Sequence, residues 1–171
     1  MKTSYDYINS RINYDLNTGI FTWKSIDAKQ RLEKTWNARY AGKQTGYVRR
    51  NGYKFIIINK REYSCGQIAW LLVHKSWSEK EIDHINGDPL DNRILNLREA
   101  TRSQNAINKG IQGNNSTGYK GVWKRRNSES WVAEIGFQGK HIKLGSFDCP
   151  IKASEAYSKK AKELHKEFAR T

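Results

Sequence analysis

Four polar residues between positions 83 and 105 have the types and order to perform phosphoryl chemistry. Asp83 and His84 are adjacent, and Asn96 and Asn105 follow them along the chain. Carboxylate and amide oxygens suit a hard divalent cation, Mg²⁺ or Mn²⁺, which can polarise a phosphate. A neutral imidazole can take a proton from water near pH 7. The set therefore predicts hydrolysis of a phosphodiester, with Asp83 as a metal ligand and His84 as the general base.

The surrounding sequence predicts a strand, a turn, a second strand and a helix. Segment 81–85 alternates polar and apolar residues, as a half-buried strand does. Segment 86–89 (Asn-Gly-Asp-Pro) is a strong turn signal, and segment 95–97 would return the chain beside its start. Segment 101–104 (Thr-Arg-Ser-Gln) matches a capping box, which places Asn105 in the first turn of a short helix.

Neighbouring side chains of an ideal strand point to opposite faces, so we expect a twist or a β-bulge to bring Asp83 and His84 to one cleft. Each residue also has a simpler explanation. An Asp often only orients a surface His, the 86–89 turn needs no site, and Asn96 between two leucines can bond backbone groups. The order of all four residues together favours the catalytic interpretation.

The composition indicates a polyanionic partner. The 171 residues include 31 Lys and Arg against 17 Asp and Glu, which gives a formal charge of +14 and a pI of about 9.8. Basic groups near phosphates displace condensed counterions, so nucleic acid is the expected partner. Hydrophobic residues make up only 37% and aromatics 12%, which favours small units over one large core.

Cysteine usage and hydropathy set the expected compartment. Cys65 and Cys149 are the two cysteines, and without a C-x-x-C pair we expect ordinary intracellular thiols and no structural zinc. Segment 1–6 lacks the apolar run of a signal peptide, and no stretch approaches the ~18 apolar residues of a membrane span. We therefore expect a cytoplasmic protein with no membrane partner.

The chain is expected to be α+β and to have four parts. The first is a basic, β-rich region, the second a helix (65–75) followed by the catalytic unit, the third a polar linker, and the fourth a three-stranded antiparallel sheet packed on one helix. Their bounds are 1–62, 63–110, 111–117 and 118–171. We expect a small antiparallel sheet in the first part and a ββα unit in the second.

The fourth part alternates in a way that predicts two different sheet faces. The inner face would carry Trp131, Ala133, Ile135 and Phe137, covered by a helix that begins near Pro150. The apolar stripe of that helix is Ala153, Tyr157, Ala161, Leu164 and Phe168. The outer face would carry Trp123, Arg125, Glu134, His141 and Lys143.

Segment 81–108 resembles the HNH nuclease motif, in the form found in phage and intron-encoded homing endonucleases. The resemblance implies a ββα-metal finger in which Asp83 and Asn105 bind one divalent metal. His84 would be the general base, and Asn96 would hold its orientation by bonding backbone. Asn105 stands where many such enzymes have a final histidine, so this is an H-N-N variant. Segment 15–75 also resembles the sheet-and-helix region that precedes the motif in these enzymes.

A second resemblance covers about residues 118–170. Segments 119–123, 131–135 and 144–147 resemble the Apetala2 or ethylene-response-factor DNA-binding domain, in which a three-stranded sheet enters the major groove. The positions that match DNA contacts are Lys120, Trp123, Arg125, Glu134, His141 and Lys143. Segment 124–126 (Lys124, Arg125 and Arg126) is expected to clamp phosphates.

Together these features predict a metal-dependent, sequence-specific endonuclease of homing type in a phage or its bacterial host. It would bind double-stranded DNA as a monomer and nick or cut both strands, leaving 5′-phosphate and 3′-hydroxyl ends. One alternative is a DNA-binding regulator with an inactive centre. The presence of all four residues, Asp83, His84, Asn96 and Asn105, argues against it. The others are an RNA-binding protein that stacks bases on its aromatics and a nonspecific nuclease, for which a C-terminal reader has little purpose.

Overall fold

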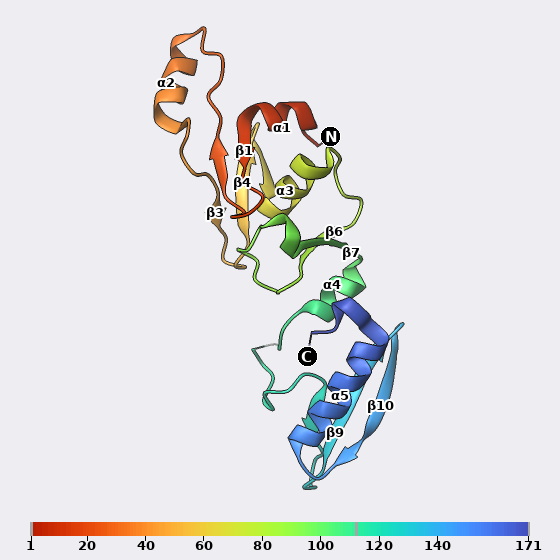
Figure 1. The fold of residues 1–171 in the computed structure, drawn as a ribbon. Coiled ribbons are helices and arrows are strands. Elements are labelled where there is room, and N and C mark those ends of the chain that lie inside the picture. Colours follow the sequence, from red (N-terminus) through yellow and green to blue (C-terminus); the bar gives the residue numbers. More distant parts are fainter. Residues whose placement is uncertain (1, 112, 171) are drawn as a thin grey trace. The chain divides into compact units, whose positions relative to one another are not determined.

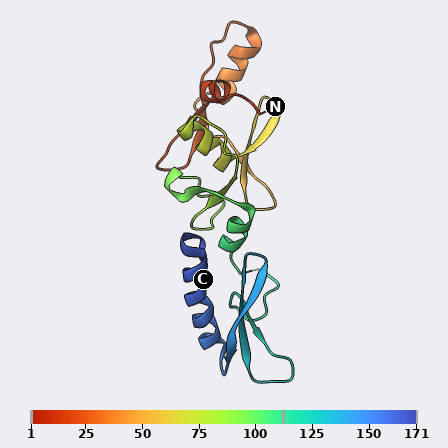
Figure 2. The same cartoon turned by 90° about the vertical axis from the view of Figure 1, so that its right-hand side faces the viewer.

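The protein, described by a computed structural model over residues 2–111 and 113–170, folds as two compact units (Figures 1 and 2). The units are Met1–Ala100 and Thr101–Thr171. Each combines small antiparallel sheets with helices, which confirms the expected α+β class. The predicted four parts do not coincide with the two units, because one core spans the predicted boundary at 62/63. Residue 112 of the predicted linker lies outside the described residues.

Three small antiparallel sheets and their helices build the first unit. The sheets pair β1 with β2, β3 with β4 and β5, and β6 with β7. The elements in chain order are α1 (Tyr5–Arg11), β1 (Ile12–Tyr14), β2 (Phe21–Trp23), α2 (Arg31–Tyr40), β3 (Tyr47–Val48), β4 (Lys54–Ile58), β5 (Arg61–Ser64), α3 (Cys65–His74), β6 (Glu81–His84), the 3-10 turn η1 (Ile94–Asn96) and β7 (Leu97–Ala100). Their shared core includes Ile8, Phe21, Ile56, Ile68 and Leu97.

Local signals explain the middle of this unit. Asn59 and Lys60 both have positive φ, as the two central residues of a tight β4–β5 hairpin require. The side chain of Ser64 accepts from the backbone N–H of Gln67 and so begins α3 with a capping box. Lys75, in the left-handed conformation, ends it. The predicted helix over 65–75 is therefore confirmed to within one residue.

The helices α1 and α2 were not predicted. Ile8 is the buried residue of α1, so its seven residues show no periodic stripe. No residue of α2 is buried, although the Glu33 carboxylate caps its start by accepting from the backbone N–H of Gln30 at 2.8 Å. Leu32, Trp36 and Tyr40 recur at four-residue spacing in α2, and this is the helical signal that the prediction overlooked.

The second unit has α4 (Arg102–Asn108), β8 (Val122–Lys124), β9 (Trp131–Phe137), β10 (Lys140–Phe147), α5 (Pro150–His165) and the 3-10 turn η2 (Lys166–Phe168). The sheet order is β10-β9-β8, and α5 packs on it through Ala153, Tyr157 and Ala161, as predicted. Gly121 has φ +66°, and a Cβ there would lie 2.2 Å from the Tyr157 ring, so only glycine fits. Among the helices that the structure describes, none combines the length and hydrophobicity that a bilayer crossing needs.

Candidate active site

Asp83 and His84 both lie on β6, and the strand is regular. β6 pairs with β7 in continuous antiparallel register, with Asp83 opposite Arg98 and His84 opposite Leu97. Both side chains are nonetheless buried, at 4% and 6% exposed. The expected β-bulge is therefore absent, and a regular strand points the two side chains to opposite faces. Arg98 covers Asp83 across the hairpin, and Gly66 of α3 packs near His84.

A guanidinium holds the carboxylate of Asp83. Arg98 Nε donates to Asp83 Oδ2 at 2.9 Å, and Arg98 Nη2 lies 2.8 Å from the same oxygen as an ion pair. Both side chains are largely removed from solvent, at 5% exposed for Asp83 and 14% for Arg98. Such a charged pair orients the carboxylate and compensates its charge where water cannot.

The imidazole of His84 is enclosed by three contacts within the first unit. Asn92 Oδ1 lies 3.3 Å from His84 Nε2, and the ring of Tyr53 meets the His84 ring edge-on with centroids 5.9 Å apart. Gly66, in α3, lies so close that a Cβ there would be 3.7 Å from His84 Cε1. Burial lowers the pKa of His84 below its usual value of 6.5, against smaller opposing effects of Asn92 and nearby carboxylates. The ring is therefore neutral at pH 7, which is the form that can accept a proton.

Asn96 closes the loop that follows His84. Its Oδ1 accepts from the backbone N–H of Asn86 at 2.9 Å, and its Nδ2 donates to the carbonyl oxygen of Asp91 at 2.8 Å. The backbone N–H of Ile85 in turn donates to the carbonyl oxygen of Asn96 at 2.8 Å. The expected bonding of Asn96 to backbone is thus present. These bonds anchor the chain directly after the imidazole.

An ion pair stiffens the same loop. Arg93 Nε and Nη2 donate to the two carboxylate oxygens of Asp91 at 2.7 and 2.6 Å, and Asn86 Nδ2 donates to Asp91 Oδ2 at 2.8 Å. The Arg93 hydrogen bonds lower the pKa of Asp91 to about 2. Asp91 is therefore fully ionised near neutral pH, and its carboxylate holds the loop together by accepting these hydrogen bonds.

The predicted second metal ligand lies in the other compact unit. Asn105 sits in the first half of α4, which Thr101 begins as predicted: its Oγ1 accepts from the backbone N–H of Gln104 at 3.2 Å. Within residues 2–111 and 113–170, no group of three His, Cys, Asp or Glu side chains could together hold a metal. A carboxylate and an amide each offer oxygen, the donor that Mg²⁺ and Mn²⁺ prefer, and these ions keep several water ligands of their own.

Three contributors to this site were missed from sequence, namely Asn92, Arg98 and Tyr53. Asn92 and Arg98 lie inside the motif segment, but their types also suit a turn and a solvated strand. The strand register alone could have suggested Arg98, since it faces Asp83 once β6 and β7 pair. Tyr53 comes from a distant hairpin, and nothing in the local sequence links it to His84.

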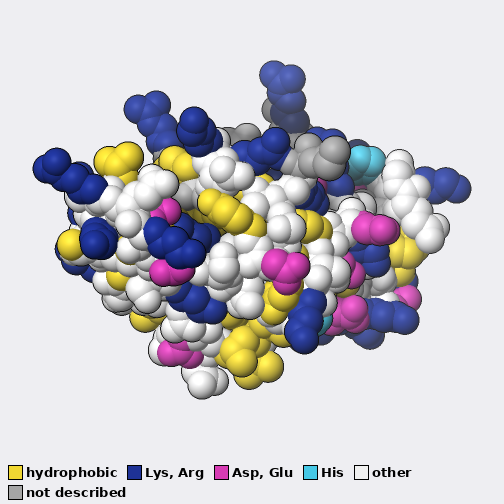
Figure 3. Space-filling view, turned by 90° about the horizontal axis from the view of Figure 1, so that it is seen from above, with side chains coloured by type: hydrophobic (Ala, Val, Ile, Leu, Met, Phe, Trp, Pro, Cys, Tyr) yellow, Lys and Arg dark blue, Asp and Glu magenta, His cyan; other side chains and the backbone are white. Residues whose placement is uncertain are grey.

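The predicted DNA-binding residues mostly share the outer face of the C-terminal sheet. Trp123 pairs with Val132, and Lys143 pairs with Glu134, on the face opposite α5. His141 Nδ1 lies 2.8 Å from Glu134 Oε1 across the same face, and Trp123 is 46% exposed. Arg125 and Arg126, at the end of β8, are exposed. Figure 3 shows Lys and Arg side chains projecting along much of the outline of the view from above.

Two predicted contacts have other partners. Lys120 Nζ donates to the carbonyl oxygens of Ile107, Lys109 and Arg170, and burial lowers its pKa. Its ammonium is thus bound to carbonyl oxygens, two of them at the end of α4. Lys124 lies over the Trp131 ring and pairs with Glu129 at 3.1 Å, which places it at the sheet edge on the inner side. Sequence cannot foresee these partners because they come from neighbouring segments.

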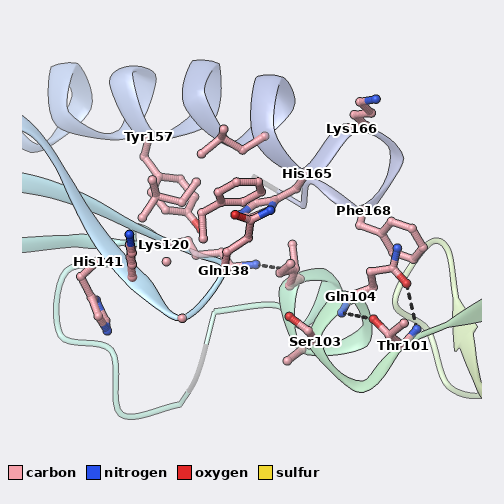
Figure 4. Close-up of a pocket in the computed structure, with 18 of the residues that line it drawn as sticks. Thr101, Ser103, Gln104, Lys120, Gln138, His141, Tyr157, His165, Lys166 and Phe168 are labelled. Atoms are coloured by element: carbon pink, nitrogen blue, oxygen red, sulfur yellow. Dashed lines mark hydrogen bonds between the residues drawn. The ribbon is translucent and has the colours of Figure 1, made fainter.

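A cavity of about 680 Å³ lies in the second unit, between α4, the β9–β10 hairpin and the end of α5 (Figure 4). Its wall mixes apolar and basic groups, among them Lys120, Gln138, Tyr157, His165 and Phe168. Burial, and the charge of Lys120, lower the pKa of His165. None of the predicted metal or base residues lines the cavity. Asn105 belongs to α4, and other residues of that helix form part of the wall.

Comparisons with known proteins give one family match and one relative. Residues 67–107 match the family model described as HNH endonuclease. Protein 3.8 of Escherichia phage T7 is 34% identical over 89 residues, which span 52% of this chain and 73% of that relative. No solved structure matches the chain significantly. The matched family segment begins within α3 and ends within α4, so it includes the whole β6–β7 hairpin.

Proposed function

Because this chain belongs to the family of the phage T7 Protein 3.8 and carries an HNH endonuclease domain, we propose that it is a metal-dependent DNA endonuclease that hydrolyses phosphodiester bonds. One observation carries the proposal: the buried, neutral imidazole of His84 directly follows the buried carboxylate of Asp83 in the sequence of β6. A proton acceptor and an oxygen ligand are the two groups that metal-assisted hydrolysis requires.

In the proposed reaction His84 accepts a proton from the water that attacks phosphorus. A new bond forms between that water oxygen and phosphorus, and the bond from phosphorus to the 3′ oxygen breaks. After solvent protonates the leaving oxygen, the products are 5′-phosphate and 3′-hydroxyl ends. A divalent cation, Mg²⁺ or Mn²⁺, held by Asp83 and Asn105 would supply charge stabilisation at the phosphate and the leaving oxygen. Asn96 keeps the loop after His84 in place.

The C-terminal sheet is proposed to position this centre on double-stranded DNA. Its exposed outer face has aromatic, basic and acidic side chains, as a surface that reads base edges and phosphates requires. This arrangement supports the resemblance to the Apetala2 type of domain. With a separate reader and one catalytic centre in each chain, we propose a monomer that recognises a long, asymmetric site as homing endonucleases do.

The activity is tested with supercoiled plasmids that carry a library of random inserts. We expect nicked or linear DNA with Mg²⁺ or Mn²⁺ and none with EDTA, and sequencing of the new ends should reveal one preferred site. A His84→Ala protein purified in parallel controls for contaminating nucleases. Gel retardation without cleavage in either metal would instead support the inactive regulator. Stronger competition by single-stranded RNA than by duplex DNA would support the RNA-binding alternative.

The proposed DNA face makes a separate prediction. Arg125→Ala should weaken binding to duplex DNA and should reduce the slope of log K against log salt by about 0.9 if Arg125 contacts one phosphate. Fluorescence anisotropy at several salt concentrations measures both quantities. The matched control is Lys159→Ala, which removes an exposed charge from α5, the layer on the other side of the sheet. Equal effects of the two variants would show that only net charge matters and that this face is not the reader.

A further inference from the structure

Both polar atoms of the buried Asn92 side chain have a partner within hydrogen-bond distance. Its Oδ1 lies 3.3 Å from His84 Nε2, and its Nδ2 donates to the carbonyl oxygen of Leu90 at 3.0 Å. A carbonyl oxygen can only accept, so the nitrogen end of the amide must face Leu90. The oxygen end therefore faces the imidazole. At 2% exposed, Asn92 has no water to replace either partner.

We infer that Asn92 is a positioning residue that fixes the neutral tautomer of His84 with its hydrogen on Nε2. An amide oxygen only accepts hydrogen bonds, so it stabilises the Nε2–H form over the Nδ1–H form. A neutral imidazole has one hydrogen, and its basic lone pair is then on Nδ1. Nδ1 is accordingly the atom that accepts the proton from water, an assignment that rests on the proposed role of His84.

The surroundings of Asn92 hold its backbone as firmly as its side chain. The hydroxyl of Tyr14 donates to the Asn92 carbonyl oxygen at 2.7 Å, and burial raises the Tyr14 pKa, so that hydroxyl keeps its proton. Gly19 packs against the same peptide, since a Cβ there would lie 2.7 Å from the Asn92 carbonyl carbon. Gly66 leaves room for the contact: its Cβ would be 3.7 Å from both Asn92 Oδ1 and His84 Cε1.

These contacts separate Asn92 from Asn96. Asn96 bonds to Asn86 and Asp91, so it shapes the loop that follows the ring. Asn92 contacts the ring itself. Its own position is held by contacts with Gly66 of α3, Gly19 of the 15–19 turn and Tyr14 of β1. The loop can therefore be intact while the tautomer is not, which allows the two roles to be tested apart.

The tautomer can be measured directly in the full-length, metal-free protein. Two-bond ¹H–¹⁵N correlations of the His84 ring at about pH 8, where the imidazole is neutral, distinguish the protonated nitrogen from the unprotonated one. We expect a single form with the hydrogen on Nε2 and slow exchange of that hydrogen with solvent. A ring with its hydrogen on Nδ1 would overturn the inference, even if the protein cleaves DNA.

Two variants then connect the tautomer to cleavage. Asn92→Asp keeps an oxygen toward the ring but loses the donor to Leu90, so it should preserve the tautomer. Asn92→Leu has a similar size but no acceptor, so it should lose the protected Nε2–H signal and cleave about 10- to 100-fold more slowly. Asn114→Leu, at an exposed turn of the second unit, is the matched control and should change neither readout. Asn92→Leu with an unchanged ring signal and wild-type cleavage would contradict the assignment.

The outcomes separate this inference from the proposed function. If the wild-type protein cleaves no DNA, the proposed function fails while the ring spectra still decide which nitrogen is protonated. If cleavage is metal-dependent but the tautomer is Nδ1–H, the function stands and the role of Asn92 is withdrawn. Thermal melts of each variant show whether a loss of cleavage comes from unfolding.

Discussion

Replacing His84 with alanine should lower the rate constant for plasmid cleavage by about 10²- to 10⁴-fold at saturating metal, the usual contribution of a general base. The reason is that no other side chain adjoining Asp83 on β6 can accept a proton from water at neutral pH. Single-turnover cleavage of supercoiled plasmid measures the effect. The variant should still bind the plasmid, since we propose His84 as a proton acceptor and not as a phosphate contact.

His84→Gln is the conservative partner of that experiment. Glutamine has a comparable volume and keeps an amide near Asn92, but it cannot act as a base near pH 7. It should therefore cleave as slowly as His84→Ala while melting closer to the wild-type temperature. Cleavage by either variant near the wild-type rate would remove His84 from the proposed chemistry and leave the base to be sought elsewhere.

Replacing Arg98 with methionine should destabilise the protein by about 3–5 kcal/mol, because it leaves the buried carboxylate of Asp83 without its charged partner. Urea denaturation monitored by tryptophan fluorescence measures the free energy of unfolding. Added Mg²⁺ should raise the melting temperature of Arg98→Met more than that of wild type. A cation at Asp83 would no longer compete with the guanidinium, and ligand binding to the folded state stabilises it.

Arg93→Met provides the matched control for that variant. Arg93 also pairs with an aspartate, but its side chain is 54% exposed, so its loss should destabilise the protein far less than the loss of Arg98. Combining Arg98→Met with Asp83→Asn should recover part of the stability, because the double variant has no unpaired buried charge. Equal destabilisation by Arg93→Met and Arg98→Met would show that burial does not determine how much the Asp83–Arg98 pair contributes to the free energy of unfolding.

Local signals in the sequence were sufficient for several elements. The Ser64 cap and the left-handed Lys75 bracket α3, Pro150 begins α5, and Thr101 begins α4. Each depends on hydrogen bonds or dihedral preferences within a few residues, which the sequence displays directly. The helix α2 was missed: Leu32, Trp36 and Tyr40 have helical spacing, but none of its residues is buried, so its apolar positions do not identify it as part of a core.

The candidate site also has features that the sequence shows and others that arise only on folding. The motif order was enough to nominate Asp83, His84, Asn96 and Asn105, because their chemistry is visible in their types. The sequence could not tell that β6 is regular or that Arg98 holds Asp83. It also could not tell that Lys120 is turned toward three carbonyl oxygens, since those belong to segments brought together only by folding.

By itself, the sequence determined the family segment, the α+β class, the basic charge and the identity of the residues able to do chemistry. Only the tertiary structure decided the environment of each one: which carboxylate is paired, which imidazole is buried and neutral, and which amide faces it. The physical reason is that residue type and spacing are local properties. Burial and hydrogen-bond partners arise from contacts such as those of Tyr14 with Asn92 and Tyr53 with His84, which lie far apart in the chain.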